Sequence, residues 1–181
     1  MTDATMTTHA TITRYTTVDS PLGELLLVGR GSASAGVALA TVSMPGQRNA
    51  PAVQGTWRRD DSVFAEAARQ ISAYFAGRLT AFELEFAVTG TDFQRRVWRA
   101  VEEIPYGTTT TYGALATRLG VPRAEVRALG AAIGANPLLL VRPCHRVIGA
   151  DGSMRGYAGG VERKVRLLTH EGALQPMLTT G

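Results

Sequence analysis

The chain of 181 residues carries its only cysteine in the stretch Pro143-Cys144-His145-Arg146-Val147. A single cysteine cannot form an internal disulfide, and alone it cannot build a cysteine-based zinc site. Two interpretations stay open: a small hydrophobic residue of the core, which is the usual role of a free cysteine, or a reactive thiol. The histidine beside it favours the reactive thiol.

A reactive Cys144 needs a base, because a free thiol has a pKa near ~8.5 and is mostly protonated at neutral pH. His145 is the nearest candidate, but adjacent side chains often point to opposite sides, so a turn or a bridging water must supply the geometry. Glu171, at the end of the last predicted helix, can orient the imidazole as the third member of a relay. Without the other residues of this group, His145 would be interpreted as a hydrogen-bonded histidine of the core, and Glu171 as a solvated residue at the end of a helix. Asn136, directly before Pro137, is expected to hydrogen-bond the backbone of a turn rather than to catalyse.

The positive charge lies in the half of the chain that holds Cys144. Residues 1–91 carry 7 basic and 8 acidic side chains, whereas residues 92–181 carry 12 basic and 7 acidic ones. Lysine occurs once, at Lys164, and the other 18 basic residues are arginine. Arginine suits phosphate contacts and stacking on bases, although codon bias alone can enrich it. The asymmetry favours a nucleic-acid partner.

Length and composition indicate a folded chain of one large or two small domains. No run of about 18 apolar residues predicts a membrane span, and residues 1–10 lack the order of a signal peptide. A lone unpaired cysteine suits a reducing cytoplasm, which is the location we expect. Residues 1–10 and 176–181 are predicted to be a disordered and a flexible tail.

The first half predicts a small α/β domain over residues 11–88. Short strands are expected at residues 23–29 and 36–42, each beginning with a glycine. Residues 62–76 have helical spacing of apolar side chains, and Gly77 is expected to end that helix. Residues 82–88 alternate between apolar and polar and predict one more strand.

The second half, residues 89–175, predicts a mainly helical domain. Thr91 and Gln94 form a capping-box pattern at the start of a helix. Its apolar stripe consists of Phe93, Val97, Val101 and Ile104. A second helix is expected at residues 111–119, ending at Gly120, and a third at residues 123–134. Two short helices joined by a tight turn make a helix-turn-helix.

The third helix presents two arginines and a run of small residues on one face. Arg123 and Arg127 lie one turn apart, and the face continues through Gly130, Ala131 and Gly134. Small residues let a helix approach something bulky, which is either another helix of the core or a nucleic acid. The arginines favour a DNA groove.

Together with Asn136-Pro137 and residues 156–160 (Gly-Tyr-Ala-Gly-Gly), the cysteine stretch resembles the active site of the O6-alkylguanine-DNA alkyltransferases, the methylated-DNA–protein-cysteine methyltransferases. The resemblance covers residues 92–172, and the first half fits the family's amino-terminal domain more loosely. It implies an α+β fold, with a small RNase H-like α/β domain followed by a mainly helical, winged-helix-like domain. It implies no cofactor. No structural zinc is expected, since family members with zinc use several cysteines in the first domain.

The resemblance also implies a reaction in which Cys144 accepts the alkyl group of O6-alkylguanine, and of O4-alkylthymine, in duplex DNA. The transfer would be irreversible, so each molecule would react once. His145 would take the thiol proton through a water, with Glu171 orienting the imidazole. Asn136 would brace the hinge between recognition helix and cysteine strand, and Tyr112 would assist base flipping and protonate the departing guanine.

The DNA contacts implied by the resemblance place the helix-turn-helix in the minor groove. Arg127 would fill the gap left in the base stack, because a thiol cannot reach O6 in a closed duplex. Arg123 and the small residues Gly130, Ala131 and Gly134 would lie against the DNA. The base pocket would consist of Tyr157, Ala158, Gly159 and Gly160, with Lys164 supporting it. A monomer in solution is implied, and cooperative binding to DNA stays open.

Two residues depart from the family pattern. Ala158 stands where many members have a serine, so only a backbone contact to guanine O6 can survive there. Arg142 stands before Pro143, where an apolar residue is usual. Two alternative functions are a lesion-binding alkyltransferase-like protein, which would lack Cys144, and a thiol hydrolase, in which the arginine-bearing helix would have no role.

Overall fold

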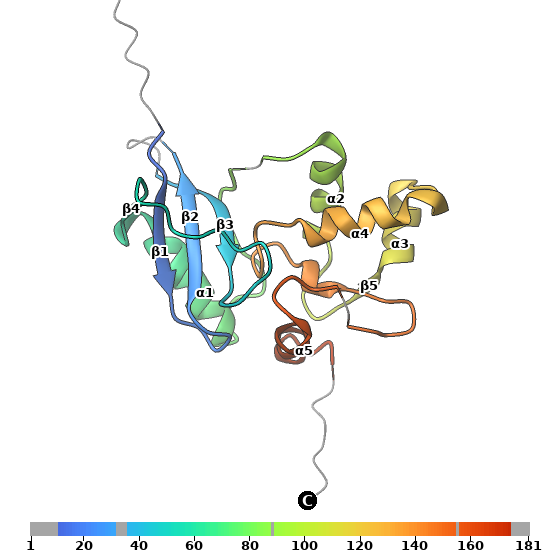
Figure 1. Ribbon diagram of the computed structural model, residues 1–181. Helices are drawn as coiled ribbons and strands as arrows, with labels where there is room; N and C mark the ends of the chain where they lie inside the picture. The colour runs from blue at the N-terminus through green and yellow to red at the C-terminus, as the bar shows by residue number, and fades with distance from the viewer. Residues whose placement is uncertain (1–10, 32–35, 88, 155, 175–181) are drawn as a thin grey trace, which may run out of the picture.

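The computed structural model describes residues 11–31, 36–87, 89–154 and 156–174. It has two parts, a sheet with one helix against it and a group of helices beside that sheet (Figure 1). The α+β architecture expected from the sequence is confirmed. The tails predicted at residues 1–10 and 176–181 lie outside the described residues.

The first part is a four-stranded sheet in the order β3-β2-β1-β4. Its strands are β1 (Arg14–Val18), β2 (Leu25–Arg30), β3 (Ala38–Ser43) and the two-residue β4 (Arg58–Arg59). β1, β2 and β3 pair antiparallel in chain order, and β4 runs parallel to β1. The strands predicted at residues 23–29 and 36–42 correspond to β2 and β3.

The helix predicted at residues 62–76 forms as a short 3₁₀ turn, η1 (Ser62–Phe64), followed by α1 (Ala65–Phe75). Phe64 and Ile71 are buried in one core with Leu25 and Leu27 of β2. Tyr74 of α1 is also buried, at 1% exposure.

The strand predicted at residues 82–88 was wrong in extent. Only Phe86 pairs with β3, through hydrogen bonds from Leu39 N to Glu85 O and from Ala87 N to Leu39 O, both 2.8 Å. The free edge of β3 is shared: further along, Val42 N donates to Pro137 O at 2.9 Å and Leu139 N donates to Val42 O at 3.1 Å. Two segments divide one short edge, so neither extends into a strand. Val88 lies outside the described residues.

The second part contains four α-helices among the described residues: α2 (Asp92–Glu102), α3 (Tyr112–Leu119), α4 (Val126–Gly134) and α5 (Val161–His170). Shorter elements are η2 (Arg123–Glu125), η3 (Cys144–Arg146) and the parallel strands β5 (Thr110–Thr111) and β6 (Val147–Ile148). α3 and α4 form the predicted helix-turn-helix, and Gly120 ends α3 at a left-handed φ of 66°. Within the described ranges, the molecule has no helix with the length and apolarity that crossing a membrane requires.

The core of the second part follows the predicted stripe. Val97, Val101 and Ile104 are buried, whereas Phe93 is only partly buried. Trp98 is buried as well, and its indole Nε1 donates to Ala132 O at 2.8 Å. That bond fixes α2 against α4, which keeps the helix-turn-helix in a set orientation.

We expect Thr91→Ala to lower the free energy of unfolding by about 1 kcal/mol. Thr91 Oγ1 accepts from Gln94 N at 3.1 Å, and Thr91 N donates to Gln94 Oε1 at 3.0 Å, so the substitution breaks the capping box of α2. Urea denaturation at neutral pH measures the change. Thr109→Ala, at an exposed loop threonine, is the matched control, and an equal loss in both variants would contradict the capping role.

Candidate active site

The chain folds back on itself between α4 and Cys144. Arg142 N donates to Leu138 O at 3.0 Å, and Cys144 N donates to Arg142 O at 2.8 Å. Leu140, buried within this turn, has a left-handed φ of 70°. A left-handed residue with a branched side chain costs about 1–2 kcal/mol, so the surrounding packing must impose it. The turn brings Cys144 close to Asn136.

Asn136 is buried, and its amide holds both the turn and the cysteine. Its Oδ1 accepts from Leu138 N at 3.0 Å, and its Nδ2 donates to Arg142 O at 3.1 Å. Nδ2 also lies 3.1 Å from Cys144 Sγ. The sequence predicted the backbone contacts; the contact with sulfur adds a direct link to the reactive atom.

Cys144 is buried, at 5% exposure, on the 3₁₀ turn η3. Burial raises the pKa of its thiol, while the hydrogen bond from Asn136 and the positive charges of Lys164 and Arg142 oppose that rise. Lys164 Nζ donates to Val147 O at 2.6 Å, so the lysine also holds the strand that follows the cysteine. The sulfur is therefore a thiol in the resting protein and needs a base.

His145, the predicted base, is fully buried and held in its neutral form. Its Nε2 lies 2.9 Å from Glu171 Oε2, which makes Nε2 the protonated nitrogen, because an ionised carboxylate only accepts. Burial holds the pKa of His145 below its ordinary value. Its Nδ1 finds no hydrogen-bond partner among the described residues, so its lone pair is free to accept a proton.

Glu171 is the hub of the buried polar groups. Arg146 binds it in a forked contact, with Nε at 2.7 Å from Oε1 and Nη2 at 3.0 Å from Oε2. Tyr74 of α1 donates its hydroxyl to Oε2 at 2.6 Å. Burial by itself raises the pKa of Glu171, but the hydrogen bonds from His145, Arg146 and Tyr74 outweigh it and hold the pKa at about 2. Sequence reasoning missed Tyr74 and Arg146, since nothing in helical spacing marks one buried tyrosine among apolar neighbours.

Two phenols interact with the sulfur, Tyr112 and Tyr157, the latter in the 156–160 loop. Burial and the nearby Cys144 raise the pKa of Tyr112 and, more strongly, of Tyr157, so both phenols stay protonated. A Cβ on Gly156 would lie 3.0 Å from the Tyr112 hydroxyl. A Cβ on Gly159 would lie 2.7 Å from Tyr157 Cε1 and 2.8 Å from Met44 Sδ, so only glycine fits there.

A cavity of about 270 Å³ joins the predicted base loop to the predicted DNA-facing helix. Tyr157 and Ala158 line it from the loop, and Ala131 and Gly134 line it from α4. Gly159, Gly160 and Lys164, which were also predicted for the base pocket, do not line this cavity. Gly160 precedes α5 at a φ of 91°, and Lys164 is fully buried.

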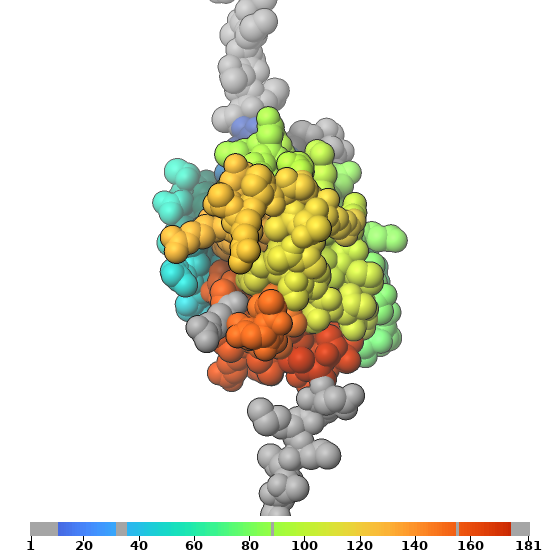
Figure 2. Space-filling view, turned by 90° about the vertical axis from the view of Figure 1, so that its right-hand side faces the viewer, coloured from blue at the N-terminus to red at the C-terminus, as the bar shows by residue number. Residues whose placement is uncertain are grey.

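The outer face of α4 is open among the described residues, which argues against the interpretation that its small residues pack against another helix of the core. Arg127 and Ala131 are exposed, and no described atom would lie within 4 Å of a Cβ placed on Gly130 or Gly134. The face therefore packs against no other helix in the described part of the chain. Arg123 is exposed on η2, before α4. Figure 2 looks onto this side of the molecule, where the yellow segment of α3 and the golden segment of α4 lie next to each other.

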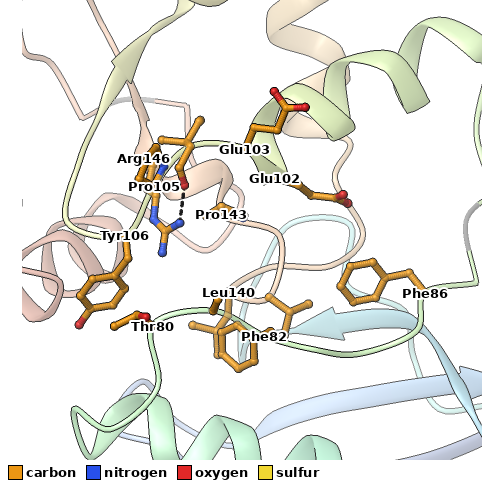
Figure 3. Close-up of a pocket in the computed structure, with 13 residues that line it drawn as sticks. Thr80, Phe82, Phe86, Glu102, Glu103, Pro105, Tyr106, Leu140, Pro143 and Arg146 are labelled. Carbon is orange, nitrogen blue, oxygen red and sulfur yellow. Dashed lines mark hydrogen bonds between the residues drawn. The ribbon is translucent and has the colours of Figure 1, made fainter.

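A larger cavity, of about 380 Å³, lies at the junction of the two parts and is not the site of the thiol. Phe82, Phe86, Tyr106 and Leu140 line it together with Pro143 and Arg146, as Figure 3 shows. Arg146 Nη1 donates to Ile104 O at 2.7 Å beside it. Neither Cys144 nor Tyr112 nor Tyr157 borders this space, whereas Tyr157, whose pKa Cys144 helps to raise, lines the smaller cavity beside α4.

Two family models match the chain in consecutive segments. Residues 13–88 match the ribonuclease-like domain of 6-O-methylguanine DNA methyltransferase, and residues 92–173 match the DNA-binding domain of the same family. The sheet and α1 lie within the first segment, and the helix-turn-helix, Cys144 and Glu171 lie within the second.

Individual proteins of this kind are similar along most of their length. The methylated-DNA–protein-cysteine methyltransferase of Mycolicibacterium paratuberculosis is 47% identical over 166 residues, which is 92% of this chain and 96% of that protein. The methyltransferase of the same name from Methanosarcina acetivorans is 43% identical over 88% of this chain and 98% of its own length. Among solved structures, Mycobacterium tuberculosis OGT in complex with DNA superposes with a TM-score of 0.77 at 44% identity, covering 88% of this chain and 93% of that one.

The buried neutral imidazole predicts that stability falls on mild acidification. His145 has a lowered pKa in the fold, so the unfolded chain binds its proton first as the pH falls below ~6.5, which costs up to about 2 kcal/mol between pH 7 and pH 5. Glu171, whose pKa is also lowered, contributes stability above ~4.3 that is lost only at lower pH, outside this window. Urea denaturation of wild type and His145→Gln at both pH values measures the difference. The glutamine variant should lose less stability over the interval, and equal losses would show that His145 is not held neutral.

Proposed function

The chain belongs to the 6-O-methylguanine DNA methyltransferase family, and from this premise we propose how its own residues carry out the reaction. Its function is DNA repair by transfer of an alkyl group from DNA to its own cysteine. We assign the acceptor role to Cys144, and O6-alkylguanine in duplex DNA, with O4-alkylthymine as a second lesion, as the substrate. The observation that carries the assignment is the buried row of contacts from Asn136 to Cys144 and from His145 to Glu171.

In the proposed reaction the sulfur of Cys144 attacks the alkyl carbon in line with the C–O6 bond. The S–C bond forms as the C–O6 bond breaks, and its electron pair leaves with the guanine. His145 Nδ1 takes the thiol proton through a water, and Glu171 stabilises the imidazolium by accepting from Nε2. Tyr112, whose pKa is raised by burial and by Cys144, is a protonated phenol that gives its proton to the departing base.

We propose that the lesion reaches the thiol by flipping out of the duplex into the cavity beside α4. A base within the stack cannot present O6 to a buried sulfur. The open face of Arg127, Gly130, Ala131 and Gly134 supports close approach of a duplex, and Arg127 is placed to fill the gap in the stack. Arg123, nearer the start of that helix, would contact phosphate.

The base pocket in this proposal is built from the loop before α5. Tyr157 stacks against the base, and the backbone at Ala158 and Gly159 contacts O6, since alanine offers no hydroxyl there. Gly160 turns the loop into α5, and Lys164 supports the pocket from behind through Val147. We further propose a monomer acting in the cytoplasm, whose reducing conditions keep the thiol free.

A lesion-binding protein that does not transfer the group is the second candidate, and Cys144 argues against it. A lesion-binding protein needs the helix-turn-helix and the pocket. It does not need a thiol that contacts Asn136 and has a neutral histidine beside it in the chain. A thiol hydrolase is weaker still, because it leaves the exposed arginine-bearing helix without a role.

One turnover per molecule is the expected outcome that tests the proposal most directly. A thioether carbon is a poor target compared with an activated aryl ether carbon, and the chain has no second cysteine to release the first. Mixing the protein with excess O6-methylguanine duplex should restore one guanine per protein. Trypsin cleaves poorly before Pro143, so Cys144 should appear in the peptide Ala128 to Arg146 with one added methylene.

Cys144→Ala is the matched control for that experiment. It should restore no guanine while retaining near wild-type affinity for duplex, because affinity is expected to come from the arginine-bearing surface. Restoration well beyond one guanine per protein, or a methyl group on another residue, would show that the assignment is wrong.

Arg127→Ala and Tyr112→Phe should separate flipping from chemistry. Arg127→Ala is expected to slow repair of duplex at least tenfold but to leave reaction with free O6-benzylguanine nearly unchanged, since a free base needs no flipping. Tyr112→Phe should slow both reactions, because both need a proton for the departing guanine. Single-turnover rates with the two substrates measure this, and an equal effect of Arg127→Ala on both would remove its role in the stack.

A further inference from the structure

Arg142 is a charged residue in the middle of the fold, with 2% of its surface exposed. Its guanidinium lies over the ring of Trp98, 4.9 Å from the centroid, and 5.5 Å from that of Phe86. Its Nε donates to Glu102 Oε1 at 2.8 Å. A buried guanidinium is costly unless it is paired, and the carboxylate and the two rings meet that requirement.

The remaining contact of Arg142 points towards the cysteine. Its Nη1 donates to Asn136 Oδ1 at 3.3 Å, and the same amide donates from Nδ2 to Cys144 Sγ at 3.1 Å. A row of contacts therefore runs from Glu102 through Arg142 and Asn136 to the sulfur. The arginine and the backbone N–H of Leu138 both occupy Oδ1, so the amide cannot reverse without losing both donors.

A cationic donor at Asn136 Oδ1 also changes how strongly the Nδ2–H groups of the same amide donate hydrogen bonds. Hydrogen bonds from charged groups are stronger than neutral ones, and a hydrogen bond to the oxygen of an amide polarises its N–H. The N–H that faces sulfur thus becomes a better donor to a thiolate. This effect needs the amide, whereas the bare charge of Arg142 would act without it.

We propose that Arg142 is a positioning residue for alkyl transfer: it holds and polarises the Asn136 amide, so that Nδ2–H stabilises the negative charge forming on the Cys144 sulfur. The inference rests on the proposed role of Cys144 as acceptor. It also gives a function to the arginine that stands where the related active sites usually carry an apolar residue.

The test is a cycle of Arg142→Leu, Asn136→Ala and the double variant, measured by the rate of Cys144 alkylation with iodoacetamide between pH 6 and pH 10. Arg142→Leu should move the pH profile upwards and slow the reaction about threefold to tenfold at pH 7, because the thiolate loses stabilisation while its nucleophilicity rises partly in compensation. In the Asn136→Ala background the same substitution should have a much smaller effect, namely the part that comes from the direct charge of Arg142 on the sulfur.

The other titratable groups that interact with the sulfur, Tyr112, Tyr157 and Lys164, are unchanged throughout the cycle, as is His145, the next residue in the chain. A residue with only a structural role would leave the profile in place, and one acting by bare charge would slow the reaction equally with and without Asn136. Either result would overturn the proposal. Arg99→Leu, at an exposed arginine of α2 that borders the same cleft as Arg142, is the matched control and should match wild type.

Folding of each variant is checked by its thermal midpoint and by binding to unmodified duplex. Arg142→Lys replaces the leucine variant in the cycle if the latter does not fold, since it keeps a charge between the rings but cannot span Glu102 and Asn136 together. Iodoacetamide requires only a thiol. Wild type that is alkylated but restores no guanine would therefore refute the proposed function alone, and an additive cycle in a protein that repairs DNA would refute the role of Arg142 alone.

Discussion

The buried carboxylate of Glu171 is the contact on which the site and the junction of the two parts both depend. It accepts from His145 and Arg146 of the cysteine turn and from Tyr74 of α1, which is 97 residues away in the chain. A buried Glu171 carboxylate without these donors would cost several kcal/mol. Loss of any one of the three donors would therefore weaken the whole group of contacts. The part that contains the sheet therefore contributes to the site, because Tyr74 of its helix α1 donates to the carboxylate that contacts His145.

The same carboxylate explains why the resting site is neutral. Glu171 stays ionised because three side chains donate to it, and it fixes the proton of His145 on Nε2. Burial disfavours a positive charge on the imidazole, and the nearby charges of Arg146 and Lys164 disfavour it further. Thiol and imidazole thus coexist unionised, and charge separates only as a substrate carbon approaches the sulfur.

Local patterns predicted those features that neighbouring residues determine. The capping box of Thr91 and Gln94 and the end of α3 at Gly120 follow from a few adjacent side chains. The strand expected at residues 82–88 failed because pairing depends on which segment occupies the edge of β3, and Leu138 takes part of it. The contacts of Tyr74 and Arg142 join elements far apart in sequence, so no periodicity could reveal them. The motif around Cys144 predicted a reactive thiol at this position, but not the arginine that reaches its amide partner.

Burial of the thiol sets its selectivity as well as its reactivity. A sulfur at 5% exposure, capped by Asn136 and walled by Tyr112 and Tyr157, meets few solutes by chance. The cavity that leads towards this region opens beside the glycine-bearing face of α4, so the route to the thiol and the surface proposed for DNA coincide. Low accessibility protects a group that can be used only once. The same burial raises the pKa of the thiol. The Asn136 amide and Lys164 oppose that rise, and the proposed proton acceptor His145 would keep the sulfur reactive towards an alkylated guanine that enters the pocket.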